Sequence, residues 1–329
     1  SSTYSLFSQV NKISDENITD KVNAEMFWQI DVPANEIDVE TTQGIVKMEG
    51  TVNSLLAKER AEKVAMATRG VKGVVNMIHV NPPQRPDGEL EQDILEALTA
   101  DPATESFDVT VQADNGVITL DGEVQSWQEK QLVGYVTKDI MGVKEVKNEI
   151  DVNYLSDRTD YEIKQEIEQA INNDIRLYPK MIKVSVKDGA VGLSGSVGSL
   201  NEKLLAKSYA WTAGVKAVSA DGLNVRDWAK NENLKKEKYP VRTDAQIKEA
   251  IEDAFLYDPR VASFNPNVTV NAGVVTLSGT VSNLKAKRAA AADARNVVGV
   301  SYVKNNLKVR PEMVPSNNIL ENRVENALV

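Results

Sequence analysis

The stretch "DNGVITLDGEV", residues 114–124, places two glycines six positions apart, with apolar residues alternating between them. The chain repeats this phrase three more times, as "GIVKMEGTV" from Gly44, "GAVGLSGSV" from Gly189 and "GVVTLSGTV" from Gly273. The second glycines of the four phrases are Gly50, Gly122, Gly195 and Gly279, so the first two steps are almost equal and the third is longer. Because recurrence at a near-constant step is the signature of a repeat array, we predict four copies of one module.

A third glycine keeps the same spacing. It stands before a valine, at a nearly constant distance after the second glycine, at Gly70, Gly142, Gly214 and Gly299. These positions define repeats at 15–83, 87–155, 157–226 and 243–310, with a charged linker at 227–242 that we expect to act as a hinge or a helical spacer. The segment 316–329 matches the opening helix of module four and predicts the first helix of an incomplete fifth repeat.

Hydrophobic periodicity changes in a fixed order within each module. Ile163, Ile167 and Ile171 recur at helical spacing, and the pattern then alternates with period two on both sides of Asn115-Gly116, a pair that favours a tight hairpin turn. A second helix follows, with good N-caps at Ser54, Ser126, Ser199 and Asn283. A final strand ends each module. The predicted order is helix, strand, strand, helix, strand.

The repeated glycines have different expected roles. The first glycine of each phrase (Gly44, Gly116, Gly189 and Gly273) is expected to form the hairpin turn, because glycine accepts positive φ. The second is explained by close approach of the following helix or by a bulge. The third is expected to end the second helix as its C′ residue. Gly192, inside the second strand of module three, is expected to weaken that strand.

The composition predicts a soluble, folded array. The chain has 329 residues, of which 42% are hydrophobic and 26% charged, and no apolar run approaches the roughly 18 residues of a membrane helix. The absence of cysteine excludes disulfides and thiolate metal sites. The chain opens at Ser1 without methionine or a signal-like apolar stretch, so we expect that a signal peptide has been removed.

The motifs argue against an enzyme. His79, the single histidine, alternates with apolar neighbours in "NMIHV" and is interpreted as a solvent-facing strand residue. "GLSGSVGS" lacks the lysine and the spacing of a phosphate-binding loop, and no catalytic triad can be assembled. We predict no catalytic residue, no metal site and no cofactor.

The phrases "DNGVITLDGEV" and "AGVVTLSGTV", each followed at similar spacing by "GVKEVKNEIDV" and "GVSYVKNNLKV" respectively, resemble the BON domain, a family named for bacterial osmotically inducible and nodulation proteins. The resemblance covers nearly the whole chain. It implies an α+β fold, αββαβ, with a three-stranded mixed sheet and both helices on one face. It also implies a secreted, periplasmic or other cell-envelope setting in bacteria, with phospholipid binding and a protective role in osmotic or envelope stress.

Charge differs sharply along the array. The formal charges of the four repeats, counted from Lys, Arg, Asp and Glu, are −4, −12, +1 and +3. The overall charge of −10 disfavours nucleic acid, but the basic end could engage anionic phospholipid headgroups or envelope proteins. The candidate lipid-binding residues are Lys235, Lys236, Lys285, Lys287, Arg288 and Arg295. Ordinary variation of surface charge is an equally weighted alternative.

Two further predictions concern contacts. Trp211 stands where the other modules have Met66, Lys138 and Arg295, an outward position, so it is a candidate partner contact. Trp127 stands where they have leucine, which favours packing in the core or between modules. The alternative to a lipid-binding protein is a structural or adhesive array that associates with itself. For the helix at 316–329, either the natural protein continues or the helix docks on a neighbouring module or another chain.

Overall fold

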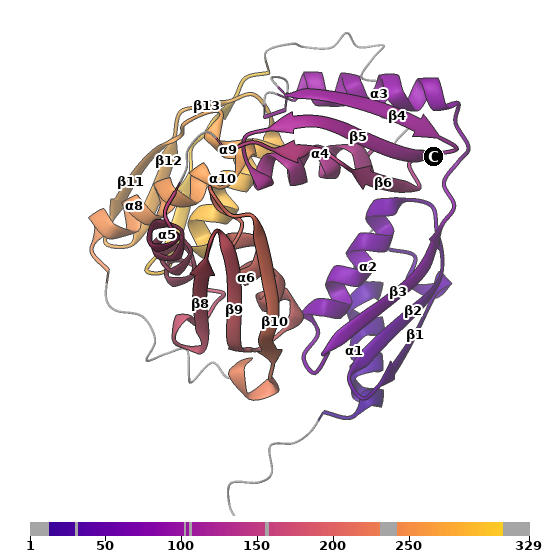
Figure 1. Cartoon of the computed structure of the whole chain (residues 1–329), viewed down its shortest axis with the longest axis horizontal. Coiled ribbons are helices and arrows are strands. Elements are labelled where there is room, and N and C mark those ends of the chain that lie inside the picture. Colours follow the sequence, from indigo (N-terminus) through magenta and orange to yellow (C-terminus); the bar gives the residue numbers. More distant parts are fainter. Residues whose placement is uncertain are drawn as a thin grey trace, which may run out of the picture. The chain divides into compact units, whose positions relative to one another are not determined.

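The computed structural model describes residues 13–29, 32–101, 103–104, 107–154, 158–230 and 242–311. The chain divides into two compact units, with the boundary between Pro240 and Val241. The first unit contains modules one to three, and the second contains module four. Each module has the predicted α+β composition, with a small mixed sheet and helices (Figure 1).

Modules one and two follow the predicted order of elements. Module one consists of α1 (Asp15–Phe27), η1 (Ala34–Glu36), β1 (Ile37–Thr42), β2 (Ile45–Val52), α2 (Leu55–Ala67) and β3 (Gly73–Val80). Module two consists of α3 (Asp87–Ala100), β4 (Asp108–Asp114), β5 (Val117–Val124), α4 (Trp127–Lys138), β6 (Glu145–Asn148) and β7 (Asp151–Val152).

Modules three and four repeat this order with short additions. Module three consists of α5 (Asp160–Asn173), η2 (Pro179–Met181), β8 (Ile182–Lys187), β9 (Ala190–Val197), α6 (Leu200–Tyr209) and β10 (Ala217–Val225), followed by η3 (Asp227–Lys230). Module four consists of α8 (Asp244–Leu256), α9 (Pro259–Ala262), β11 (Asn267–Asn271), β12 (Val274–Ser278), β13 (Thr280–Val281), α10 (Leu284–Asn296), β14 (Tyr302–Asn305) and β15 (Lys308–Val309).

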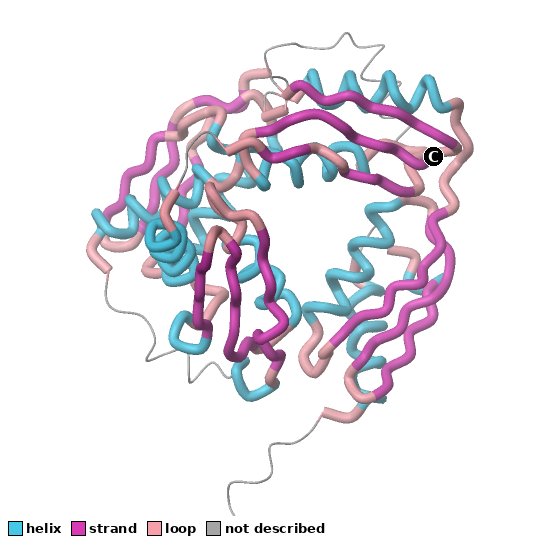
Figure 2. The backbone as a smooth tube through the Cα atoms, in the orientation of Figure 1, coloured by secondary structure: helices cyan, strands magenta, loops and turns pink. Residues whose placement is uncertain are grey.

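The second strand of each module lies at the centre of its sheet. In module one, β2 runs antiparallel to β1 and parallel to β3, and the other modules repeat this arrangement (Figure 2). The connection from second to third strand runs through the second helix, as a parallel pair requires. The two long helices of a module contact each other as well as the sheet, so they cover one face of it. The predicted αββαβ fold is confirmed.

The last strand varies between modules. It is continuous in module one as β3 and divided in modules two and four. In module three, β10 is continuous, but its register against β9 shifts between Ser219 and Gly222. The strand β9, which contains Gly192, runs unbroken from Ala190 to Val197. The irregularity therefore lies on the neighbouring strand rather than on the strand that carries the additional glycine.

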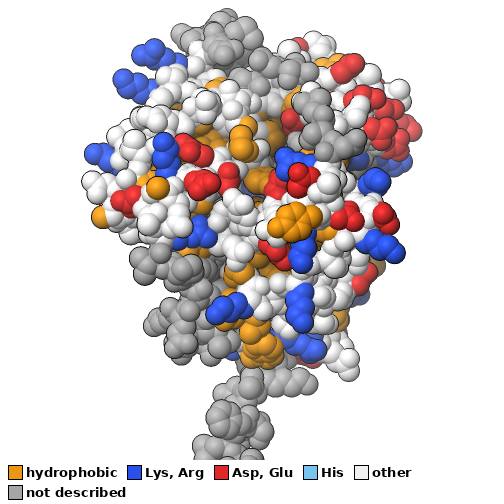
Figure 3. Space-filling view, turned by 60° about the vertical axis from the view of Figure 1, so that its left-hand side comes forward, with side chains coloured by type: hydrophobic (Ala, Val, Ile, Leu, Met, Phe, Trp, Pro, Cys, Tyr) orange, Lys and Arg blue, Asp and Glu red, His pale blue; other side chains and the backbone are white. Residues whose placement is uncertain are grey.

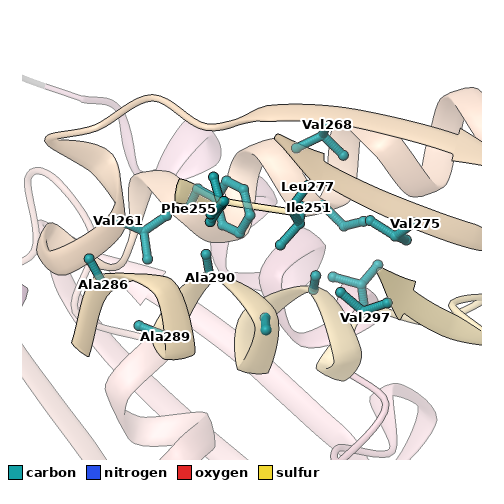
Figure 4. Close-up of a cluster of buried hydrophobic side chains, with 14 of the residues drawn as sticks. Ile251, Phe255, Val261, Val268, Val275, Leu277, Ala286, Ala289, Ala290 and Val297 are labelled. Atoms are coloured by element: carbon teal, nitrogen blue, oxygen red, sulfur yellow. The ribbon is translucent and has the colours of Figure 1, made fainter. Parts of the chain in front are cut away.

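Each module has its own hydrophobic core between its helices and its sheet. In module four, Ile251 and Phe255 of α8 meet Val275 and Leu277 of β12, and alanines of α10 close the other side (Figure 4). These alanines, which include Ala290, are buried, so α10 packs closely on the sheet. The periodic apolar residues of the sequence are the ones that form the cores.

The predicted N-caps of the second helices are confirmed in all four modules. Ser54, Ser126, Ser199 and Asn283 each accept a hydrogen bond from a backbone N–H in the first turn. The first glycines also adopt the predicted turn. Asn115 and Gly116 both have positive φ, 51° and 81°, as in a type I′ hairpin turn.

The second glycine has a different neighbour from the predicted one. A Cβ atom on Gly122 would lie 2.0 Å from the carbonyl oxygen of Asp108, and one on Gly50 would lie 2.1 Å from that of Glu36. These carbonyls belong to the start of the antiparallel partner strand or to the residue before it. The crowding therefore comes from the backbone beside the strand and not, as predicted, from the following helix, and the antiparallel register runs through Gly50 and Gly122 without a bulge.

Gly279 is an exception among the second glycines. Its φ is +122°, but a Cβ there would meet no atom closer than 3.9 Å. The central strand of module four is interrupted at this glycine, which separates β12 from β13. The backbone conformation, rather than crowding, explains the glycine at this position.

The third glycine is predicted to end the second helix, but this prediction is wrong. The helix α2 ends at Ala67 with Thr68 as its C-cap, before Gly70 is reached. Gly70 has φ +95°, and a Cβ there would lie 2.9 Å from the Cδ1 atom of Ile18 on α1. The glycine therefore permits a turn into the last strand and leaves room for the first helix.

Candidate functional site

An aspartate at the start of each first helix fastens the hairpin turn of its own module. Both carboxylate oxygens of Asp160 accept backbone hydrogen bonds, from Asp188 at 2.8 Å and Gly189 at 2.9 Å. Asp15, Asp87 and Asp244 make the same pair of bonds in the other modules. Two charge-assisted bonds from one carboxylate hold the turn against the first helix. The sequence alone does not show that these aspartates bind the distant hairpin turn.

The second helices connect modules one, two and three to one another. Leu55, the first residue of α2, packs against the hydrophobic core of module two as well as that of module one. One turn further along α2, Glu59 accepts a hydrogen bond from the ammonium of Lys138 on α4, at 2.6 Å. An apolar contact and an ion pair therefore join α2 to module two.

The corresponding contact between modules two and three uses tryptophan. Trp127, the first residue of α4, stacks on Trp211, with 6.0 Å between ring centroids and 5° between ring planes. The Nε2 group of Gln128 donates a hydrogen bond to the carbonyl of Trp211, at 3.1 Å. Trp211 follows α6 at the register position of Lys138. The candidate partner residue is therefore partly buried against another module of the same chain.

A third contact returns from module three to module one. Leu200, the first residue of α6, packs against the core of module one, and α6 contacts α2. The first residue of each second helix in this unit therefore meets another module: Leu55 meets module two, Trp127 meets module three, and Leu200 meets module one. Modules one to three thus form a closed circuit of contacts through equivalent positions.

Module three contains a partly buried polar cluster. The Asp174 carboxylate binds the guanidinium of Arg176 through both oxygens and accepts a hydrogen bond from the hydroxyl of Tyr209, at 2.7 Å. Burial raises the pKa of the Tyr209 hydroxyl above its usual value, and Asp174 raises it further. Burial lowers the pKa of Arg176, but the hydrogen bonds and charges of Asp174 and Tyr209 together outweigh this effect, so the pKa is raised. The cluster joins α6 to the segment after α5 and has the character of a structural support.

Module four presents the candidate basic residues on α10. Leu284 is 57% exposed, and Lys285, Arg288 and Arg295 are also exposed. Leu284, Arg288 and Arg295 fall on one face of the helix, because their intervals are close to whole helical turns. Arg288 and Arg295 occupy the register positions of Glu59 and Lys138, which form the ion pair between modules one and two.

Lys287 points elsewhere. Its ammonium donates a hydrogen bond to the carbonyl oxygen of Leu307, at 2.6 Å, and the side chain is partly buried. It ties α10 to the last strand instead of extending toward solvent. Lys235 and Lys236, and the helix expected at 316–329, lie outside the described residues, as does most of the linker.

His79 is the single histidine of the chain. His79 is exposed on β3, as the alternation predicted, and it pairs with Thr51 across the sheet. Among the described residues, no group of three or more His, Cys, Asp or Glu side chains could hold a metal ion. Nor does any helix within those residues have the length and apolarity to cross a membrane.

On the face in Figure 3, Lys and Arg side chains are interspersed with Asp and Glu side chains.

Comparison with known proteins gives one family. The BON domain profile matches residues 14–82, 86–154, 159–227 and 243–311. The chain is 31% identical over 147 residues to osmotically-inducible protein Y of Escherichia coli (strain K12), an alignment that covers 43% of this chain and 73% of that protein. It is 31% identical over 140 residues to an uncharacterized protein in the gshII 5′ region of Anaplasma centrale, covering 41% of this chain and 91% of that protein.

A solved structure also shows a distant similarity. It is CdsD, a structural protein of the type III secretion system of Chlamydia trachomatis. The identity is 13%, the match covers 62% of this chain and 90% of that chain, and the TM-score is 0.18.

Proposed function

Because the chain belongs to the family of BON-domain proteins, we propose that it is a non-enzymatic protein of a bacterial envelope that binds anionic phospholipid surfaces through module four. Its similarity to osmotically-inducible protein Y supports a protective role in osmotic or envelope stress. The same family membership supports a periplasmic or otherwise secreted location.

The observation that carries the proposal is the exposed face of α10. It combines the apolar Leu284 with the guanidinium groups of Arg288 and Arg295, and Lys285 is exposed beside them. An amphipathic helix binds a membrane surface by burying apolar side chains at the headgroup boundary while its cations meet anionic headgroups. Each such cation near the surface contributes about 1 kcal/mol, and salt screens this contribution.

The charge distribution makes module four the favoured point of contact. Its formal charge is +3, whereas that of module two is −12. An anionic surface therefore attracts the fourth module and repels the second. Lys287 contributes little to this contact, because Leu307 already holds its ammonium.

Co-sedimentation with vesicles tests the proposal. The full chain should sediment with vesicles that contain phosphatidylglycerol but not with vesicles of phosphatidylcholine alone. Binding should weaken between about 50 mM and about 300 mM salt, because the screening length shortens. Equal sedimentation with both vesicle types, or none with either, would contradict the proposal.

A further inference from the structure

The open face of the sheet in module two carries an unusual arrangement of charge. Asp108 lies directly opposite Glu123 on β5, and Glu123 lies directly opposite Asp151 on β7. The three carboxylates form one row across the sheet, and all three residues are exposed. Like charges directly opposite each other destabilise a sheet, so this row costs stability unless cations cover it.

More carboxylates lie on the same face, Asp121 beside the row and Asp114 and Glu145 at the hairpin-turn end of the sheet. Asp114, Asp121 and Glu145 are also exposed, and Lys147 is the one basic residue among the described strand residues of this face. The surface is hollowed at the row, where Asp108, Asp121 and Glu123 line a depression together with Thr110, Gln125 and Asn153. A long cationic side chain can enter such a depression and reach several carboxylates at once.

Module four carries the opposite pattern on the same face. Position by position, the carboxylates Asp114, Asp121, Glu123, Glu145 and Asp151 of module two are replaced by Asn271, Ser278, Thr280, Tyr302 and Lys308. Lys304 and Lys308 are exposed there, and no acidic residue lies on the described strands of this face. The hydroxyl and amide side chains on this face are short, so they do not cover the lysines.

Exposed aromatic and apolar side chains lie on the same face as the lysines of module four. Tyr302 is 65% exposed and lies opposite Val274, which is 39% exposed. An exposed tyrosine beside an apolar residue is a common feature of protein contact surfaces. Lys308 lies opposite Thr280, at the register position where Asp151 lies opposite Glu123 in module two. The two faces therefore match in fold, and their net charges are opposite: Lys308 reverses the charge of Asp151, whereas Lys304 stands where module two also has a lysine, Lys147.

We propose that the open sheet face of module four, with Lys304 and Lys308, docks on the carboxylate row of module two in a second copy of this chain. Opposite charge on matching faces favours the encounter and fixes its orientation. Because the two surfaces differ, the contact is head-to-tail: it closes as a pair if both contacts form between the same two chains, and otherwise extends into a longer assembly. The surface is separate from the exposed face of α10, so the proposal does not depend on lipid binding.

Sedimentation velocity of the full chain over a range of concentrations, without lipid, tests the proposal. At about 20 mM salt the protein should associate, and the dissociation constant should rise by about tenfold or more at about 300 mM salt. The double variant Lys304→Glu/Lys308→Glu should remain monomeric at low salt. A protein that is monomeric at every concentration and salt, as pairing within one chain would also produce, overturns the proposal.

Two further variants make the test specific. Asp121→Lys/Glu123→Lys should also remain monomeric alone, but mixing it with Lys304→Glu/Lys308→Glu should give a complex, because the first variant keeps the lysine face of module four and the second keeps the carboxylate row of module two. The variant Arg288→Glu/Arg295→Glu has the same change of net charge as the lysine variant and should associate like the unchanged protein. Absence of a complex in the mixture, or equal loss in the arginine variant, would contradict docking through these faces.

Discussion

The indole rings of Trp127 and Trp211 lie parallel, with 6.0 Å between their centroids, and they join module two to module three. Both residues occupy positions that recur in every module. Trp127 begins a second helix, as Leu55 and Leu200 do, and Trp211 takes the place of Lys138. The stack is therefore one form of a contact that the first three modules make at equivalent sites.

Removal of this stack should destabilise the three-module unit. Trp211→Ala is expected to lower the free energy of unfolding by about 1–3 kcal/mol, because it removes both ring stacking and buried area. Urea denaturation of the full chain measures the loss. Trp28→Ala is the matched control, since Trp28 is 80% exposed, and its effect should stay within about 0.5 kcal/mol. Equal effects of the two variants would show that the stack does not stabilise the unit.

The ion pair between Glu59 and Lys138 should contribute less than the stack. Both side chains are about a quarter exposed, so solvent screens the pair. A double-mutant cycle with Glu59→Gln and Lys138→Gln is expected to give a coupling of roughly 0.5–1 kcal/mol that decreases with salt. A coupling of zero at low salt would show that Leu55 alone holds this contact.

The second glycines should differ in their tolerance of a side chain. Gly122→Ala forces a Cβ against the carbonyl of Asp108, in addition to the strain of φ +136°. Gly279→Ala meets only the strain of φ +122°. We expect Gly122→Ala to cost about 2–4 kcal/mol and Gly279→Ala about 1–2 kcal/mol. Thermal melting of the two variants checks this order, and an equal or reversed order would contradict the assignment of crowding to Gly122.

The aspartate that fastens the hairpin turn should be sensitive to small changes. Asp160→Ala leaves the N–H groups of Asp188 and Gly189 without their acceptor and is expected to cost about 1–2 kcal/mol. Asp160→Asn retains one oxygen acceptor and should cost less. Hydrogen exchange at the amides of residues 188 and 189 should accelerate in the alanine variant. Unchanged exchange would show that the turn is held by its own backbone conformation.

The fold was predictable because its signals are local and repeated four times. The turn at Asn115-Gly116 and the helix caps at Ser54, Ser126, Ser199 and Asn283 depend on chemistry within a few residues. The role of Gly122 was only partly predictable, since its crowding comes from Asp108 at the start of the neighbouring strand. The third glycine was misassigned because Gly70 and Ile18 meet only in the folded module.

The contact surfaces were less predictable than the fold. The sequence marked Trp211 as an outward residue, but the partner on its ring is another module of the same chain. Lys287 and Arg288 are adjacent and equally basic in sequence, yet the structure holds Lys287 on Leu307 and leaves Arg288 exposed. Such differences depend on which face of a helix meets the sheet, and charge alone does not reveal that.

Vesicle binding by two charge-matched variants tests the central claim, that α10 of module four engages an anionic surface. Arg288→Glu/Arg295→Glu and Lys304→Glu/Lys308→Glu change the net charge of the full chain equally, but only the first pair lies on α10. In co-sedimentation with phosphatidylglycerol vesicles at low salt, the arginine variant should lose binding by about tenfold or more, whereas the lysine variant should bind like the unchanged protein. Equal loss in both variants, or no loss in the arginine variant, would contradict the account.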